Sequence, residues 1–187
     1  MRWFFYGRWA RNLASEPKKN YSGNQHFPEI KKDLLMALLM IIFIVLQFLL
    51  LLIMALHDWI EIRPLTDIKA LAAGHSLYGR FMTTVVNTFT VLLPLIYTVY
   101  YGDTLPSNVC RGIAIVYGLL TLGTILSWWV PYIFGSSQKH KEGFKEFRNT
   151  HTFLPSRGDN VIPNTLHCIL HVLVWLCFGI AIYLLMQ

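Results

Sequence analysis

The amino-acid sequence predicts an all-α polytopic integral membrane protein, a four-transmembrane-helix bundle with short interfacial helices. Two observations support this prediction: the composition and the spacing of long apolar runs. Hydrophobic residues make up 55% of the 187 residues and charged residues 14%, against about 45–50% and about 25% in soluble domains. This balance excludes a disordered chain, and three cysteines are too few for a disulfide scaffold.

Four long uncharged runs are the candidate transmembrane helices. They cover residues 34–56, 81–101, 112–134 and 162–186. At a rise of about 1.5 Å per residue, each run can cross a hydrocarbon core of about 30 Å. Helices are expected because they satisfy their own backbone hydrogen bonds in lipid, and the runs lack the alternating pattern of barrel strands. We therefore predict a single membrane domain over residues 1–187.

The segments outside these runs are expected to lie at the membrane surface. Residues 1–33 are rich in basic and aromatic side chains, and the start of this segment predicts an interfacial helix. In the loop 135–161, acidic and basic residues alternate around Phe144 and Phe147, which predicts a short amphipathic helix. Connectors of this length leave no room for a soluble domain.

Residues with helix-starting and helix-ending preferences predict the bounds of two helices. Thr66 is expected to cap a short helix over residues 67–73, and Gly74 follows as its C-terminal stop. Pro163 suits the first turn of the last span, because its fixed φ angle matches the start of a helix.

Four spans place the N- and C-termini on the same side of the membrane, and the connectors 57–80 and 135–161 on the other. The 16 Lys and Arg residues divide equally between the two sides, so counting them gives no orientation. The first span usually dominates, and its terminal flank is basic, which favours a cytoplasmic location for the termini. The net charge of +6 suits anionic lipid headgroups, and no nucleic-acid partner is expected.

Histidine is the residue type that indicates a site. His167 and His171 are spaced i, i+4, so their rings share one face of the last span. They are expected about 7 Å and about 13 Å below its surface end. His57 ends the first span on the same side, and His151 lies in the following loop. Asp58 could orient one of the imidazole rings.

Two imidazoles at this spacing can converge on one metal ion. The predicted ligands are His57, His151, His167 and His171, and the predicted metal is iron, zinc or manganese. Haem b is the weaker alternative, because His167 and His171 lie on one helix and cannot hold opposite faces of one ring. The structural alternative is that buried histidines only form hydrogen bonds across the bundle.

Polar residues of the other spans are expected to line a pocket with these histidines. The predicted lining residues are Gln47, Asp58, Thr83, Asn87 and Ser127. Gly123 and Ser127 also form a pair of small residues four apart, which permits a close approach of two membrane helices.

Three functions remain open, and the sequence does not decide whether the protein is an enzyme. The first is an accessory or assembly subunit of a larger membrane complex, bound to a membrane protein partner or to copies of itself. The second is a metal-dependent oxidoreductase or hydrolase, and the third is a binder of lipid or of another small molecule. Spans without charged residues argue against an ion-coupled transporter. The lack of a C-x-x-C motif argues against a thiol oxidoreductase.

Overall fold

A computed structural model describes the backbone of residues 23–187 and the side chains from residue 30 onward. The predicted interfacial helix at the start of the chain lies outside these residues. The chain separates into two units, residues 1–37 and 38–187. The described residues of the first unit form the early turns of α2 (Gly23–Leu56). Residues 23–33 form the first turns of this helix, and its apolar stretch begins within them, at Ile30.

All regular elements of the described chain are helices, and no strand is present among these residues. The other helices are α3 (Ile68–Gly74), α4 (Leu77–Tyr101), α5 (Ser107–Thr124), α6 (Val130–Phe134), α7 (Gln138–Gly143) and α8 (Thr165–Leu185). Two 3₁₀ turns, η1 (Gly102–Thr104) and η3 (Lys145–Phe147), and one π-helical segment, η2 (Ile125–Trp129), complete the elements.

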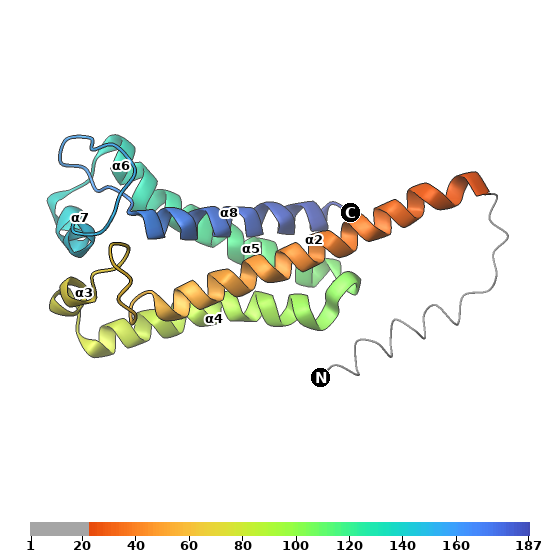
Figure 1. The fold of residues 1–187 in the computed structure, drawn as a ribbon, viewed down its shortest axis with the longest axis horizontal. Helices are drawn as coiled ribbons and strands as arrows, with labels where there is room; N and C mark the ends of the chain where they lie inside the picture. Colours follow the sequence, from red (N-terminus) through yellow and green to blue (C-terminus); the bar gives the residue numbers. More distant parts are fainter. Residues whose placement is uncertain (1–22) are drawn as a thin grey trace. The chain divides into compact units, whose positions relative to one another are not determined.

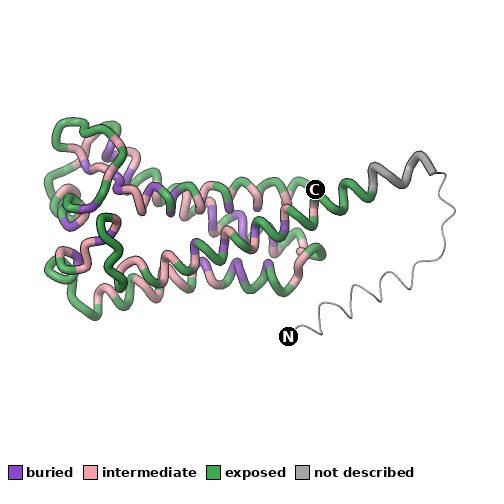
Figure 2. The backbone as a smooth tube through the Cα atoms, viewed as in Figure 1, coloured by how far each residue is buried: buried purple, intermediate pink, exposed green. Residues whose placement is uncertain are grey.

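Four helical stretches are long and apolar enough to cross a membrane, as predicted. They are Ile30–Leu56, Leu77–Thr104, Ser107–Phe134 and Thr165–Leu185. Most of the apolar surface of these stretches is exposed (Figure 2), and acyl chains are the solvent that suits such a surface. A multi-pass membrane protein is therefore indicated.

Within residues 38–187, the core lies between the long helices. Phe43 and Leu50 of α2, Tyr117 of α5 and Val174 of α8 are almost fully buried. The most extensive contact between two helices joins α5 and α8. A Cβ added at Gly118 would lie 3.1 Å from Cε2 of Phe178, so Gly118 is the small residue that lets these two helices approach.

The predicted role of the Gly123–Ser127 pair in helix packing is wrong. Both residues are exposed, and a Cβ added at Gly123 would meet no atom within 4 Å. Small residues promote packing only on a helix face that meets another helix. The face that carries Gly123 points away from the bundle.

The two connectors 57–76 and 135–164 lie at one end of this unit, where α2 ends and α8 begins (Figure 1). Turn η1 and the C-terminus lie at the opposite end. Alternating spans explain this arrangement, since every second connector returns to the same side.

The caps in these connectors differ from the prediction. Asp67, and not Thr66, caps α3, because its side chain accepts a hydrogen bond from the backbone N–H of Ala70 at 3.0 Å. The hydroxyl of Thr66 instead donates to the carbonyl of Ile60. Likewise, Asn164 caps α8, so Pro163 precedes the helix and does not form part of its first turn.

The amphipathic helix expected in the loop 135–161 is shorter than the charge pattern suggested. Ser137 caps α7, which ends at Gly143, and a separate 3₁₀ turn follows at η3. The break separates Glu142 from Glu146, which turns inward and is buried.

Candidate functional site

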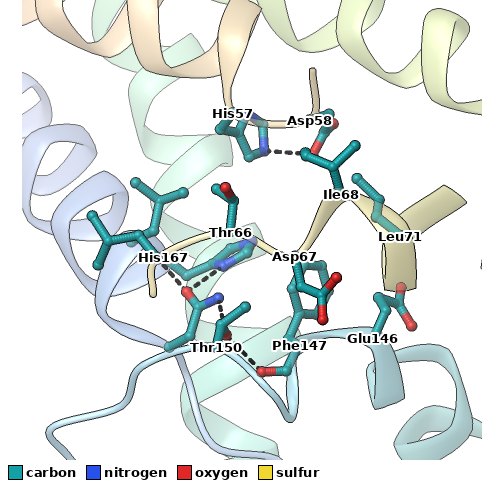
Figure 3. A pocket seen from close by; sticks show the side chains of 13 residues that line it. His57, Asp58, Thr66, Asp67, Ile68, Leu71, Glu146, Phe147, Thr150 and His167 are labelled. Carbon is teal, nitrogen blue, oxygen red and sulfur yellow. Dashed lines mark hydrogen bonds and ion pairs between the residues drawn. The ribbon is translucent and has the colours of Figure 1, made fainter. Parts of the chain in front are cut away.

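A small cavity with a mostly apolar surface lies where the two connectors meet (Figure 3). Its volume is about 20 Å³, enough for about one water molecule. The end of α2 and the first connector form one part of the wall, and the second connector and the start of α8 form the other. The polar residues of the wall are His57, Asp58, Thr66, Asp67, Glu146, Thr150, Asn164 and His167.

Contacts between the connectors hold this wall in place. Nε2 of His75 lies 2.8 Å from Oε1 of the buried Glu146, which ties the end of α3 to η3. The backbone N–H of His151 donates to the carbonyl of Pro64 at 2.8 Å. Two segments that are distant in the sequence therefore position the same cavity.

His167 is held in one tautomer by the residue that caps its own helix. Oδ1 of Asn164 accepts the backbone N–H of His167 at 2.9 Å and also meets its ring Nδ1 at 2.7 Å. A carbonyl oxygen only accepts hydrogen bonds, so Nδ1 carries the proton. The other ring nitrogen, Nε2, has no hydrogen-bond partner among the described residues and is available as a base.

The side chain of Asn164 is itself held in place by a hydrogen bond to Thr150. It is buried, with 1% of its surface exposed, and its side-chain NH₂ donates to the hydroxyl of Thr150 at 2.8 Å. That hydroxyl donates to the carbonyl of Phe147 at 2.6 Å. The resulting chain of hydrogen bonds leaves the amide of Asn164 only one orientation, because the reverse would place NH₂ against the N–H of His167.

His57 also faces the cavity and also uses Nδ1 to contact a carbonyl oxygen, but a carboxylate lies beside its Nε2. Its Nδ1 lies 2.9 Å from the carbonyl of Ile53, and its Nε2 lies 3.2 Å from Oδ1 of Asp58. The carbonyl of Ile53 only accepts hydrogen bonds, so Nδ1 of His57 donates to it. The carboxylate of Asp58 lies beside the other ring nitrogen. The side chains of His57 and Asp58 are only 11% and 13% exposed, so little solvent screens the interaction between them.

The two imidazoles lie across the cavity from each other. Their ring centroids are 6.2 Å apart, and the rings are nearly perpendicular, at 84°. Nε2 of His167 has no hydrogen-bond partner among the described residues, whereas Nε2 of His57 lies beside the carboxylate of Asp58. The two imidazoles therefore have different surroundings, a feature that acid–base sites share.

The π-helical segment η2 turns two consecutive tryptophans toward α8. The centroid of the Trp128 ring lies 4.1 Å from that of His167. The indole N–H of Trp129 donates to Nδ1 of His171 at 3.1 Å. Such segments in α-helices are often found at functional sites. Here the segment provides the aromatic surface against which both histidine rings pack.

The predicted set of metal ligands is not supported. Only His57 and His167 line the cavity. His171 is buried among aromatic rings, with its Nδ1 occupied by Trp129. His151 is exposed and bonds through Nδ1 to the hydroxyl of Thr165. Within residues 30–187, no three His, Cys, Asp or Glu side chains are arranged to hold a metal ion, so the predicted iron, zinc or manganese site is not supported there.

Of the predicted lining residues, only Asp58 reaches the cavity. Thr83 and Ser127 are exposed on the outside of their helices, and Asn87 is half-buried. Gln47 is fully buried deep in the bundle, where its NH₂ donates to the hydroxyl of Thr98 at 3.0 Å. The position of a residue along a span does not tell which face of the helix it occupies.

Five polar residues of the wall were not predicted as site residues: Thr66, Asp67, Glu146, Thr150 and Asn164. Asn164 carried a signal, since it stands three residues before His167 at the start of an apolar run, the spacing of an N-cap. Glu146 carried none, because its partner His75 lies 71 positions away in the chain.

A larger groove of about 360 Å³ adjoins the cavity. The groove and the cavity share Phe147 and Thr150 as wall residues. All lining residues of the groove come from the second connector, within residues 141–162. The groove is large enough for a small ligand, whereas the cavity is not.

Comparison with known proteins gives no match to this chain among family models, curated protein sequences or solved structures. Its function is therefore argued from the site.

Proposed function

We propose that the protein is a membrane hydrolase in which His167 is the general base and the His57–Asp58 pair is the acid. The observation that supports this proposal is that two imidazoles face one water-sized cavity and that only His57 has a carboxylate beside its Nε2. Pairs of titratable groups held in different protonation states are typical of acid–base catalysis.

Each wall residue has a part in the proposed reaction. A water molecule in the cavity attacks the carbonyl or phosphoryl centre of a substrate, and its proton passes to Nε2 of His167. The leaving group takes a proton from Nε2 of His57, whose bond to Asp58 is released. One proton then returns from His167 to His57 through water, and both residues regain their starting states. Asn164 is a positioning residue, which keeps Nδ1 of His167 protonated throughout.

The substrate would enter from the neighbouring groove. A cavity of about 20 Å³ has room for the attacking water but not for a substrate. The shared wall at Phe147 and Thr150 brings a molecule bound in the groove close to the two histidines. An ester or phosphoester of a membrane-associated molecule fits this placement.

Hydrolysis of fluorogenic esters and phosphoesters by the purified protein in nanodiscs tests the proposal. His167→Gln and His57→Gln are each expected to lower turnover by about 100-fold or more, the usual size of a general acid or base contribution. His151→Gln is the control, because His151 is exposed and does not line the cavity. Equal turnover in the wild type and His167→Gln would rule out the assigned base.

A spectroscopic measurement tests the same assignment without a substrate. In ¹⁵N NMR spectra of histidine-labelled protein at neutral pH, His167 is expected to be protonated at Nδ1 alone. His57 is expected to be protonated at both nitrogens. A doubly protonated His167 would contradict the proposal.

The function of an accessory or assembly subunit stays a prediction. It depends on the aromatic start of the chain, which lies outside the described residues. Deletion of residues 2–12 and a native gel remain its test, since a docking segment would release the protein from its complex. The metal-dependent enzyme is not proposed, because the described residues supply no ligand set.

A further inference from the structure

We infer that the groove within residues 141–162 binds the phosphate headgroup of an anionic membrane lipid. The inference concerns the groove alone and does not depend on hydrolysis in the cavity. Its volume of about 360 Å³ falls within the range of small-molecule sites, about 300–1,000 Å³.

The charges in the groove favour an anion. Lys141 and Arg148 line it together with one carboxylate, Asp159. Nζ of Lys141 lies 2.6 Å from Oδ2 of Asp159, and only 13% of the lysine side chain is exposed. The hydrogen bond and charge of Lys141 hold the pKa of Asp159 below its usual range, and the charge of Arg148 adds to this effect. Lys141 and Asp159 therefore neutralise each other near pH 7.

Arg148 is the charge that remains. It is exposed, and no carboxylate lies within 4.0 Å of it in the part of the chain that the structure describes. A guanidinium group binds phosphate through two parallel hydrogen bonds, which a lysine cannot form. Thr152 lines the same groove and offers a hydroxyl group as a further donor.

The position and the apolar part of the groove favour a lipid over free phosphate. The connector follows Phe134, the last residue of one span, and ends at Thr165, the first residue of the next. It therefore lies at the level of the headgroups. Phe144 and Ile162 line the groove beside the charged residues, so an amphiphile can place its glycerol and upper acyl carbons against them. Inorganic phosphate has no group that suits these side chains.

Native mass spectrometry of the full chain, from micelles with equal amounts of phosphatidylglycerol and phosphatidylcholine, tests the inference. The wild type is expected to retain phosphatidylglycerol preferentially. Arg148→Gln is expected to weaken this retention about tenfold or more, the size expected for loss of a charge-assisted hydrogen bond. Lys139→Gln is the matched control, because Lys139 is an exposed cation of the same connector that does not line the groove.

A second variant is expected to strengthen the retention of phosphatidylglycerol instead of weakening it. Asp159→Asn removes the only carboxylate lining the groove and releases Lys141, so retention of phosphatidylglycerol is expected to increase. A variant that merely folds poorly would not show this gain. Equal losses in Arg148→Gln and Lys139→Gln, or a loss in Asp159→Asn, would overturn the inference.

Two further measurements complete the test. One distinguishes a lipid headgroup from free phosphate as the ligand of the groove, and the other distinguishes lipid binding in the groove from hydrolysis in the cavity. A large excess of inorganic phosphate is expected not to displace the lipid, and displacement would overturn the lipid assignment. His167→Gln is expected to retain phosphatidylglycerol as the wild type does, even where hydrolysis is lost. Binding and turnover can thus fail independently.

Discussion

Asn164 illustrates how one residue can serve both the fold and the site. As the N-cap of α8 it accepts the backbone N–H of His167, and the same oxygen accepts the ring Nδ1–H. A helix cap is rigid because its backbone partner is rigid. The ring of His167 is therefore oriented by an interaction that the helix needs in any case.

Substitution of Asn164 is expected to change the helix cap and the orientation of the His167 ring together. Asn164→Ala loses the cap, which typically costs about 1 kcal/mol, and leaves the His167 ring free to change tautomer. Asn164→Asp keeps an acceptor for both N–H groups and loses only the donor to Thr150. Thermal unfolding and ¹⁵N NMR of the histidines measure the two quantities. A single Nδ1–H tautomer in Asn164→Ala would show that the cap does not orient the ring.

Gln47 and Thr98 form an isolated polar pair in the core. Both are fully buried, and Oε1 of Gln47 has no partner among the described residues. Thr98→Val would leave the Gln47 NH₂ without an acceptor. Its expected cost is about 1 kcal/mol, since hydrogen bonds between membrane helices average about 0.6 and reach about 1.7 kcal/mol.

Gln47→Leu is expected to be milder than Thr98→Val, because it removes the unpaired oxygen together with the amide. In the double variant, Thr98→Val should add little to the effect of Gln47→Leu. Unfolding in mixed detergent micelles compares the three variants. Additive losses would mean that the two side chains act independently.

At the scale of elements, the π-helical segment determines which side chains pack against the histidines of α8. The segment η2 presents Trp128 to His167 and Trp129 to His171. The same segment exposes the carbonyl of Ser127, which lies 3.1 Å from Nε2 of His140. One irregular stretch therefore orients both histidines of the last span and anchors α7.

The approach of α5 to α8 depends on a particular glycine. Gly118→Val is expected to cost about 1–3 kcal/mol, because the added atoms meet Phe178 in a packed contact. Gly123→Val makes the same chemical change on an exposed position with open space around it, and is expected to be nearly neutral. Thermal unfolding of both variants measures the two losses of stability. A larger loss in Gly123→Val would restore the packing role predicted from the sequence.

At the scale of the whole molecule, the arrangement of spans predicts which loops share a side of the membrane. The three cysteines are buried, so they should react little with a polar maleimide in the native state. Lys69→Cys and Lys139→Cys, one in each connector near the site, are expected to label from the same side. Asp103→Cys, in η1, is expected to label from the opposite side.

Membrane-impermeant labelling of sealed, oriented vesicles makes this measurement. It also supplies the orientation, which equal numbers of basic residues on the two sides leave open. The four-span arrangement requires one membrane crossing between residues 103 and 139. If Asp103→Cys and Lys139→Cys react from the same side, the chain crosses an even number of times between them, and the four-span arrangement is wrong.

Much of the architecture could be read from the sequence alone. Long uncharged runs determine where helices cross a membrane, because unpaired backbone groups are too costly in lipid. For the same reason, the number of long apolar helices was predicted correctly and their bounds nearly so. The histidines near one end of the spans were also recognised, and two of them line the cavity.

The site itself was decided by tertiary structure. Spacing along a helix placed His167 and His171 on one face, but only the π-helical segment determined that His171 meets Trp129 and not the cavity. Glu146 and His75 are in contact although they belong to connectors that are distant in the sequence. The residue pattern within either connector does not predict such a contact. The amino-acid composition of a helix reflects the solvent that surrounds it. The shape of a cavity depends instead on how several helices and connectors are oriented and packed against one another.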